Sequence, residues 1–431
     1  MFSFKPGKQT ELAVTITCLQ AFLLFGYDQG VFGGLVTNDD FLNTFGRPNS
    51  SLLGIIVSIY NIGCLLGCIA NFIFGTKFGR RQAIWAAMAF ICLGAVVQTA
   101  SYGVPQLMVG RVITGFGVGI DTSTVPMYQS ELCKPNRRGR LVSTELLFVA
   151  VGITFAYFYD FGLSYVGGPM AWRLPIATQI AFAIPIAILM IPLPESPRWL
   201  IQRGRVDDAT KVLMQNYGVD DDDEELQTER KSIIDICDLE RKAGFHWTSI
   251  FKKDAVQTGW RIFLSCLILT MNQWTGINVV VFYAAVVLEQ NYMIFFGVSM
   301  AGIPWCYSAE ILPLHVRAPG ISIAVMFNWI SVFTIVMITP VLVSNITWKT
   351  YLIFMVMNFV FIPIIYFLFP ETANRSLEDI DFLFLKHDRL SPDEQHWIDR
   401  YGMSGVANEP VVADRNLESK NTAEHIEHSK A

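Results

Sequence analysis

Asp28 places a carboxyl group inside a long apolar run, "LAVTITCLQAFLLFGYDQGVFGG". Where such a run crosses a membrane as a helix, an ionised carboxylate near its centre costs about 2.5–3.5 kcal/mol on insertion scales. A residue retained at that cost is a candidate functional group, and the chemistry that it offers is reversible protonation. The alternative is a static role in a buried ion pair.

Gln273 and Asn278 bring amide groups into another apolar run, at about 260–288. They are five positions apart, which places them on related faces of one helix. Their amides supply hydrogen-bond donors and acceptors of the kind that orient a small polar molecule in a cavity. The alternative is that these amides only bond neighbouring helices.

Both groups require helices that cross a bilayer, and the composition predicts such helices. Apolar residues make up 52% of the 431 residues and charged residues only 16%, which is unusual for a soluble domain. Near-uncharged runs long enough to cross about 30 Å of hydrocarbon occur at about 12–36, 52–74, 83–101, 105–127, 142–163, 174–193, 260–288, 292–312, 319–343 and 350–370. The sequence therefore predicts an all-α polytopic membrane protein with ten spans.

Basic residues orient these spans. Lys77, Arg80 and Arg81 follow the second span, four basic residues lie within 134–140, and Lys and Arg are frequent from 203 to 253. By the positive-inside rule these segments are cytoplasmic, so both termini are expected in the cytoplasm. The first span is too long for a signal-peptide core and is expected to be retained.

Four regions follow from the pattern. Residues 1–193 are expected to form an N-terminal six-helix bundle, and residues 194–258 a cytoplasmic linker with short amphipathic helices such as "VDDATKVLMQ". Residues 259–371 form a C-terminal bundle of about four helices. Residues 372–431 form a cytoplasmic tail that we expect to be partly disordered.

The two halves carry a repeated motif. Tyr128, Glu131 and Arg138 in "PMYQSELCKPNRRG" have the same spacing as Tyr307, Glu310 and Arg317 in "PWCYSAEILPLHVRA", and "PES" at 194 corresponds to "PET" at 370. Such a duplication is typical of secondary transporters built from repeated bundles around a central pathway.

The repeat also measures a shortfall in the second half. Leu12, where the first span starts, lies 119 residues before Glu131, whereas Trp260 lies only 50 residues before Glu310. The second half is therefore shorter by about 69 residues, enough for two spans and a loop. The tight junction "VVLEQNYMIFFGVSM" at 286–300 is the expected place of the loss.

The motifs resemble those of the sugar porters of the major facilitator superfamily, in a fungal form. They are "FGYDQGVFGG", "GTKFGRR", "GRVITGFGVG", "PMYQSE", "PESPRWL", "NQWTGIN", "GIPWCYSAEILPLHVRA", "FNW" and "PETANRSLEDID", in the order of that family and over nearly the whole chain. Members have twelve helices in two six-helix bundles. The resemblance implies that this chain lacks helices 8 and 9.

The resemblance assigns roles to several residues. It implies that Asp28 is a proton-coupling acid with Arg111 as its charge partner. It also implies that Gln273, Asn278, Trp305 and Asn328 bind the substrate. Two departures leave the choice between hexose and polyol open: Leu146 stands where the family has a binding Gln in its fifth helix, beside Glu145, and a binding Asn of helix 8 is absent with that helix.

A cytoplasmic gate is expected from charged residues at the inner ends of the helices. In the first half these residues can form an ion network that holds the outward-facing state, whereas in the second half the arginines of the missing loop are absent. The predicted gate residues are Arg80, Arg81, Glu131, Arg138, Glu195, Arg198, Glu310, Arg317 and Glu371.

Other kinds of chemistry receive no support from the sequence. "GFGVG" at 115–119 lies inside a predicted span with no strand before it, so it predicts close helix packing and not a nucleotide loop. No nucleophile–base arrangement or metal-ligand spacing is found. We expect no enzyme activity, no cofactor, no metal and no nucleic-acid partner.

The sequence thus predicts a proton-coupled transporter of a sugar or polyol in a lipid bilayer, with the plasma membrane as the family expectation. Two alternatives stay open. One is a sugar-sensing receptor, although the tail is short for a signalling segment. The other is a truncated or mis-spliced product that does not transport.

Overall fold

The computed structural model describes residues 6–133; 138–234 apart from 221, 225, 228, 229 and 232; 257–278; 303–312; 316–372; and 380 and 384. Within these ranges the chain forms helices and their connections, and no residue is in a β-strand. The junction at 286–300, the side chains of Arg138 and Arg317 and nearly all of the tail after 372 lie outside this description.

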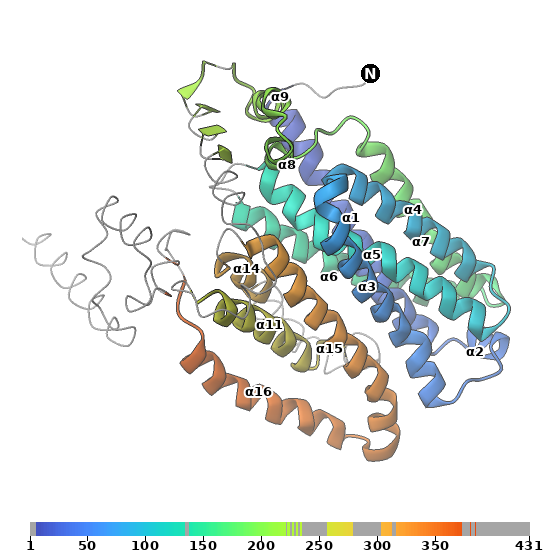
Figure 1. Cartoon of the computed structure of the whole chain (residues 1–431). Helices are drawn as coiled ribbons and strands as arrows, with labels where there is room; N and C mark the ends of the chain where they lie inside the picture. Colours follow the sequence, from blue (N-terminus) through green and yellow to red (C-terminus); the bar gives the residue numbers. More distant parts are fainter. Residues whose placement is uncertain are drawn as a thin grey trace, which may run out of the picture.

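The N-terminal half contains the six predicted spans as helices. They form the bundle at the right of Figure 1, with the short helix α2 at one end. Their bounds are α1 Lys8–Leu35, α2 Asp39–Thr44, α3 Ser50–Phe78, α4 Arg80–Thr99, α5 Val104–Leu132, α6 Arg138–Ser164 and α7 Met170–Leu189.

The C-terminal half contributes the remaining helices. Two short helices precede it, α8 Pro197–Gln202 and α9 Val206–Tyr217, the latter formed by the predicted amphipathic stretch. The larger helices are α11 Thr258–Trp274, α14 Ile303–Glu310, α15 Arg317–Ile346 and α16 Lys349–Leu368. α11 and α14 occupy parts of the predicted spans at 260–288 and 292–312.

Local signals set several helix ends. The side chain of Asn49 accepts a hydrogen bond from the N–H of Leu52 at 2.8 Å, which caps the start of α3. α3 ends at Gly79, whose φ of 82° is a conformation that glycine adopts without steric cost. α5 begins just after Gly103 with a proline in its first turn, where the missing N–H costs no intrahelical bond.

Glycines allow the helices of the first half to approach closely. A Cβ on Gly115 would overlap the carbonyl oxygen of Tyr60, and one on Gly119 would overlap that of Cys64, so "GFGVG" packs α5 against α3 as the sequence predicts. α1 and α6 approach in the same way, because a Cβ on Gly26 would overlap the carbonyl oxygen of Val149. These contacts fix the register between the helices.

Seven of the described helices are long and apolar enough to cross a membrane, namely α1, α3, α4, α6, α7, α15 and α16. α5 is not among them because it carries buried polar residues, Arg111 and Asp121 included. It packs against α1, α3, α4 and α6, so it lies in the interior of the bundle. α16 is the least buried of these seven helices: only 11% of its most apolar 18-residue stretch is buried.

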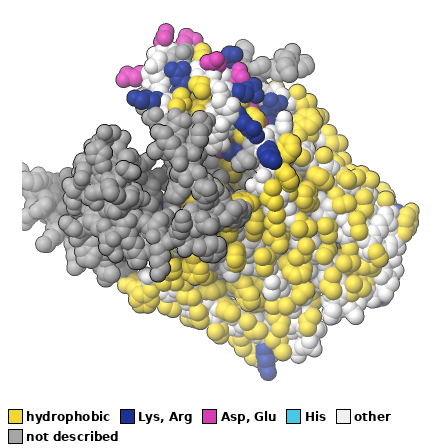
Figure 2. Space-filling view, in the orientation of Figure 1, with side chains coloured by type: hydrophobic (Ala, Val, Ile, Leu, Met, Phe, Trp, Pro, Cys, Tyr) yellow, Lys and Arg dark blue, Asp and Glu magenta, His cyan; other side chains and the backbone are white. Residues whose placement is uncertain are grey.

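The surface has the distribution expected of a membrane protein. Figure 2 shows hydrophobic side chains over the flank of the molecule, whereas Lys, Arg, Asp and Glu gather at the end where α8 and α9 lie. We call this the basic end, after Lys77, Arg80, Arg81 and Arg203. The opposite end carries α2.

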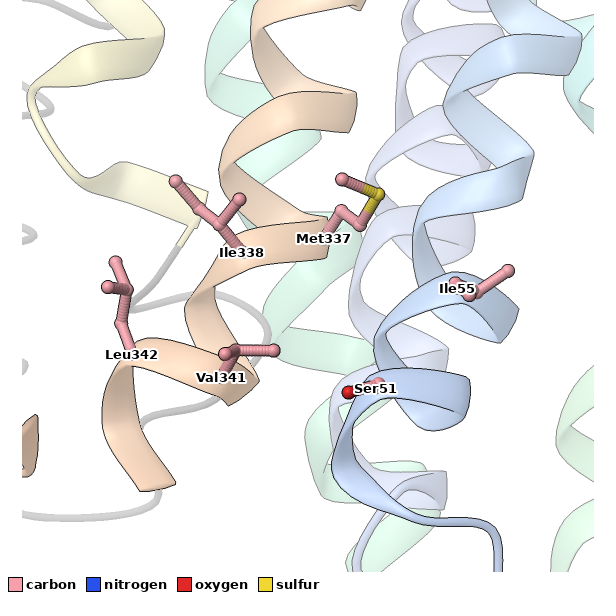
Figure 3. Close-up of a pocket in the computed structure, with 6 residues that line it drawn as sticks. All are labelled: Ser51, Ile55, Met337, Ile338, Val341 and Leu342. Carbon is pink, nitrogen blue, oxygen red and sulfur yellow. The ribbon is translucent and has the colours of Figure 1, made fainter. Parts of the chain in front are cut away.

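The two halves meet along α3 and α15. Near the opposite end, a Cβ on Gly54 would lie 3.1 Å from the carbonyl oxygen of Met337, so the two helices are in close contact there. A cavity of about 420 Å³ between them is lined by Ser51, Ile55, Met337, Ile338, Val341 and Leu342 (Figure 3). Its lining is almost entirely apolar, and none of the predicted substrate-binding residues belongs to it.

Candidate functional site

Three of the predicted binding residues form a continuous chain of amides between α11 and α15. Gln273 Nε2 donates to Asn328 Oδ1 at 2.6 Å, and Asn278 Nδ2 donates to Gln273 Oε1 at 2.6 Å. All three side chains are buried, with 8% or less of their surface exposed. Residues 55 positions apart in the sequence are therefore held together by a polar contact inside the C-terminal half.

The backbone around Asn278 differs from the uninterrupted helix that the sequence predicts. α11 ends at Trp274, and Gly276 has a φ of 97°, a conformation that ends a helix and that residues with a side chain rarely adopt. Asn358 Nδ2 of α16 donates to the carbonyl of Thr275 at 3.1 Å, so a backbone group at the break has a partner. Broken helices of this kind are tolerated at membrane depth where protein surrounds them.

Two tryptophans lie on α14 and α15, in the same half of the chain as the amides. Trp305 of α14 is half-buried and packs against the main hydrophobic cluster. Trp329, next to Asn328 in the "FNW" motif, is buried and makes edge contacts with Phe25 at 5.9 Å and Tyr60 at 6.5 Å between ring centroids. Sequence reasoning missed Trp329, although its place in the motif was a signal. It joins α15 to α1 and α3, across the boundary between the halves.

Asp28 and Arg111 are both buried, each with 2% of its surface exposed, but no hydrogen bond joins them. Arg111 donates to the carbonyl oxygens of Ile56 at 3.3 Å and Val57 at 2.6 Å, and its guanidinium lies 3.7 Å from the ring centroid of Phe32. Both oxygens of Asp28 lack a hydrogen-bond partner. The two residues interact electrostatically without a hydrogen bond, so Arg111 acts on Asp28 as a neighbouring charge.

Other buried carboxyl groups were not singled out from the sequence. Asp121 of α5 and Asp160 of α6 have 2% and 6% of their surface exposed. Glu145 of α6, which the sequence raised only as a neighbour of Leu146, has 1%. Each has at least one carboxyl oxygen without a hydrogen-bond partner. The rule that identified Asp28, a carboxyl group in an apolar run, would also have found Asp121 and Asp160.

At the basic end the structure brings together four of the predicted gate residues. Arg80 makes a two-point contact with Glu131, Nε to Oε2 and Nη2 to Oε1, both at 3.0 Å. Glu195 accepts hydrogen bonds from the backbone N–H groups of Arg80 and Arg81 at 3.0 and 3.2 Å. We call Arg80, Arg81, Glu131 and Glu195 the basic-end cluster.

Glu195 acts as a cap supplied from a distant segment. The start of α4 has no cap from its own preceding residue, Gly79, and Glu195 provides the acceptor in its place. A negative charge at a helix N-terminus is also favourable to the helix dipole. Burial raises the pKa of Glu195 above its usual range, and the hydrogen bonds from Ser196, Arg80 and Arg81 oppose that shift.

The second half repeats part of this arrangement. Tyr128 OH donates to the carbonyl of Pro194 at 2.7 Å, and Tyr307 OH donates to the carbonyl of Pro370 at 3.1 Å, so the repeat in the sequence is a repeat of contacts. Thr372 Oγ1 donates to Glu310 Oε2 at 3.2 Å.

The remaining predicted gate residues differ in exposure. Arg198 is half-buried and Glu371 is exposed. No group of three or more His, Cys, Asp or Glu side chains able to hold a metal is found among the residues that the structure describes.

Comparison with known proteins gives a consistent family. The family described as "Sugar (and other) transporter" matches residues 13–293 and 290–384. The MFS-type transporter oryC of Aspergillus oryzae is 33% identical, over 88% of this chain and 86% of that protein. The Sugar transporter STL1 of Saccharomyces cerevisiae is 30% identical, over 88% and 82%. The High glucose sensor RGT2 of the same yeast is 28% identical, over 84% of this chain but 59% of that protein.

The alignment with oryC contains positions that this chain lacks. It has 461 positions, whereas 88% of this chain amounts to about 379 residues, so about 80 positions are occupied only by the relative. The two family matches meet at 290–293, within the predicted junction.

Solved structures with the same fold include the proton:xylose symporter XylE bound to 6-bromo-6-deoxy-D-glucose. Its TM-score is 0.71 at 22% identity, over 87% of this chain and 99% of that chain. The inward open conformation of XylE from E. coli gives a TM-score of 0.69 at 22% identity, over 86% and 99%.

Proposed function

Because the chain belongs to the sugar transporter family of the major facilitator superfamily, we propose that it carries a monosaccharide or polyol across the membrane by alternating access, coupled to a proton. The family makes the chain an integral membrane transporter and not an enzyme. Our proposal concerns the substrate, the coupling ion and the host membrane. For the host membrane we propose the plasma membrane.

The observation that carries the substrate proposal is the amide chain of Gln273, Asn278 and Asn328. Amides offer both donors and acceptors, which suits the hydroxyl groups of a sugar, and Trp305 and Trp329 supply aromatic faces for its C–H surfaces. The three hydrogen-bonded amides lie on two helices and at a broken helix end, as the binding residues of transporters do. A bound sugar would exchange these internal hydrogen bonds for bonds to its own hydroxyls, which lowers the net cost of burying the amides.

Asp28 is the proposed coupling acid. It is buried without a hydrogen-bond partner and lies in the electrostatic field of Arg111. A proton bound there removes a charge whose burial is costly. The neighbour XylE, described as a proton:xylose symporter, supports the same choice of ion. One proton moving down 100 mV supplies about 2.3 kcal/mol, enough for roughly fifty-fold accumulation.

The basic end is the proposed cytoplasmic side, with both termini on it, because Lys and Arg favour that side. There the basic-end cluster is the proposed gate. The contact of α3 with α15 near the opposite end is the proposed second gate. The two gates would open alternately, so that the central pathway is open to one side of the membrane at a time.

The four regions 1–193, 194–258, 259–371 and 372–431 remain our proposed division of the chain, with the second bundle lacking helices 8 and 9. Two rivals follow. A truncated product that does not transport is favoured by the roughly 80 positions present only in the relative. A receptor is favoured by the likeness to a glucose sensor. It is disfavoured because the match covers only 59% of that longer protein.

Uptake by the purified chain in liposomes tests the proposal. We expect accumulation of radiolabelled D-glucose, D-xylose or D-sorbitol driven by an imposed pH gradient. Asp28→Asn should abolish accumulation while exchange of labelled for unlabelled substrate continues. Asp160→Asn, which removes another buried carboxyl group, is the matched control and should accumulate normally.

The possible results separate the rivals. Accumulation that is unchanged in Asp28→Asn would refute proton coupling through this residue. Binding of a substrate without any exchange would favour the receptor. The 431-residue chain would be identified as a truncated product by two results together. It would show neither binding nor exchange, and the protein encoded by a transcript with about a hundred extra codons between those for Gln290 and Tyr292 would show both.

A further inference from the structure

Asp121 and Glu145 are two buried carboxyl groups that the proposed mechanism does not use. Asp121 lies on α5 and Glu145 on α6, with 2% and 1% of their surfaces exposed. Asp121 Oδ1 and both oxygens of Glu145 have no hydrogen-bond partner. A buried ionised carboxylate needs such partners, so these groups are not built as a pair of permanent charges.

The helix register places the two groups at one level of the bundle. α1 and α5 are antiparallel, with Thr15 bonded to Gln129 and Phe32 stacked on Arg111, so Asp121 lies beside residues 22 and 23 of α1. α1 and α6 are parallel, with Gly26 against Val149. The same register places Glu145 beside residue 22.

Asp28 lies farther from the basic end than this pair. With a rise of 1.5 Å per residue, six residues of α1 separate the two levels by about 9 Å. Asp121 interacts electrostatically with Asp28 on one side and with Glu145 on the other. Asp28, itself buried and without a hydrogen-bond partner, therefore adjoins the pair from a third helix.

Other titratable groups on the packed helices lie near Asp28, Asp121 and Glu145. Cys18 of α1 interacts electrostatically with both carboxyl groups of the pair and with Cys133, just after α5. Arg111 of α5, Tyr27 of α1, and Tyr60 and Cys64 of α3 interact electrostatically with Asp28. Among the described residues, the one cation in this set is thus on the far side of Asp28 from the pair.

Two carboxylates close together in a low-dielectric interior cannot both ionise without a compensating cation, and a pair of this kind holds one shared proton. We propose that Asp121 and Glu145 form a second proton-binding site, between Asp28 and the basic end, which receives the coupling proton before its release. This proposal rests on the proposed function, because it deepens the proton path that begins at Asp28.

The O–H bond of the Asp28 acid breaks, and its proton passes through water to a carboxylate oxygen of the pair, where a new O–H bond forms. Asp28 is left as a carboxylate in the field of Arg111. The pair, which now carries two protons, then gives one of them to water at the basic end and returns to its singly protonated form.

Infrared difference spectroscopy of the purified chain in liposomes, between acid and alkaline pH, tests the site without any substrate. We expect a carboxyl C=O band that disappears in the double variant Asp121→Asn/Glu145→Gln and persists in Asp28→Asn. Glu145→Asp, which keeps a carboxyl group, should keep the band. A spectrum of the double variant equal to the wild-type spectrum would overturn the proposal.

Transport of D-glucose provides the second measurement. In the double variant we expect pH-driven accumulation to fall by about fifty-fold at an equivalent of 100 mV, while exchange stays near the wild-type rate and shows that the variant is folded. Accumulation unchanged in the double variant would overturn the relay. If the wild type accumulates nothing, the proposed function fails, and the infrared bands alone still decide whether the pair binds a proton.

Discussion

Separating Arg80 from Glu131 gives the sharpest test of the basic-end cluster. Their side chains are 9% and 8% exposed, and two hydrogen bonds of 3.0 Å join them. Arg80→Met would leave the carboxylate of Glu131 buried without this partner. Removal of one member of a buried ion pair costs about 3–5 kcal/mol, so we expect the free energy of unfolding to fall by that amount.

The double variant Arg80→Met/Glu131→Gln removes both charges of the pair. It should therefore recover at least about 2 kcal/mol of the loss. Unfolding by SDS in mixed micelles, followed by circular dichroism, measures both values. Arg47→Met is the control, because its ion pair with Asp39 has side chains 64% and 79% exposed and should contribute at most about 1 kcal/mol.

Additivity decides the outcome. If the loss in the double variant equals the sum of the losses in Arg80→Met and Glu131→Gln within about 0.5 kcal/mol, the two residues act independently and the reasoning from a buried pair is wrong. An equal loss in Arg47→Met and Arg80→Met would show that burial does not set the cost.

Three further predictions follow from single side chains. Gln273→Leu leaves the amides on either side without their shared partner, so the half-saturation concentration for uptake of D-glucose should rise about tenfold or more; an unchanged value would remove the amide chain from the binding site. Gly152→Ala places a Cβ against the carbonyl oxygen of Leu23 and should lower the melting temperature, whereas Gly162→Ala meets no atom within 4 Å and should not. Burial raises the pKa of Glu195, so the native state keeps this proton to higher pH than the unfolded state does. The stability should therefore fall as the pH rises above the usual glutamate pKa of about 4.3. Glu195→Gln should lose that part of the decline in melting temperature, and the same pH profile in the variant and the wild type would contradict the prediction.

The apolar runs predicted ten helices because a polar backbone in lipid must satisfy its own hydrogen bonds. Eight of them are described as long helices, and the spans at 260–288 and 292–312 are described in part, as α11 and α14. The high cost of a carboxyl group in such a run singled out Asp28, and the same argument was available for Asp121 and Asp160. The repeated Tyr and Pro positions in the sequence coincide with a repeated contact, found at Tyr128 and Tyr307. These properties depend on residue type and spacing alone.

Other features depend on how helices are rotated and aligned against one another. The sequence predicted one helix through Asn278, but Gly276 adopts a positive φ and the chain breaks there. The resemblance gave Arg111 as the charge partner of Asp28, and the structure adds that the guanidinium also donates to two carbonyl oxygens of α3. Such partners lie on different helices, and hydropathy carries no information about them.

The sequence by itself carried the family motifs, and it predicted which segments cross the membrane and how they are oriented, because transfer of each residue from water to lipid is a local property. Tertiary structure decided which buried polar groups meet. Glycine contacts such as Gly26 against Val149 set the register of α1 and α6, and that register brings Glu145 to the level of Asp121. A shift by one residue along the helix would turn the side chain about 100° away, so only the packed structure could assign this pair.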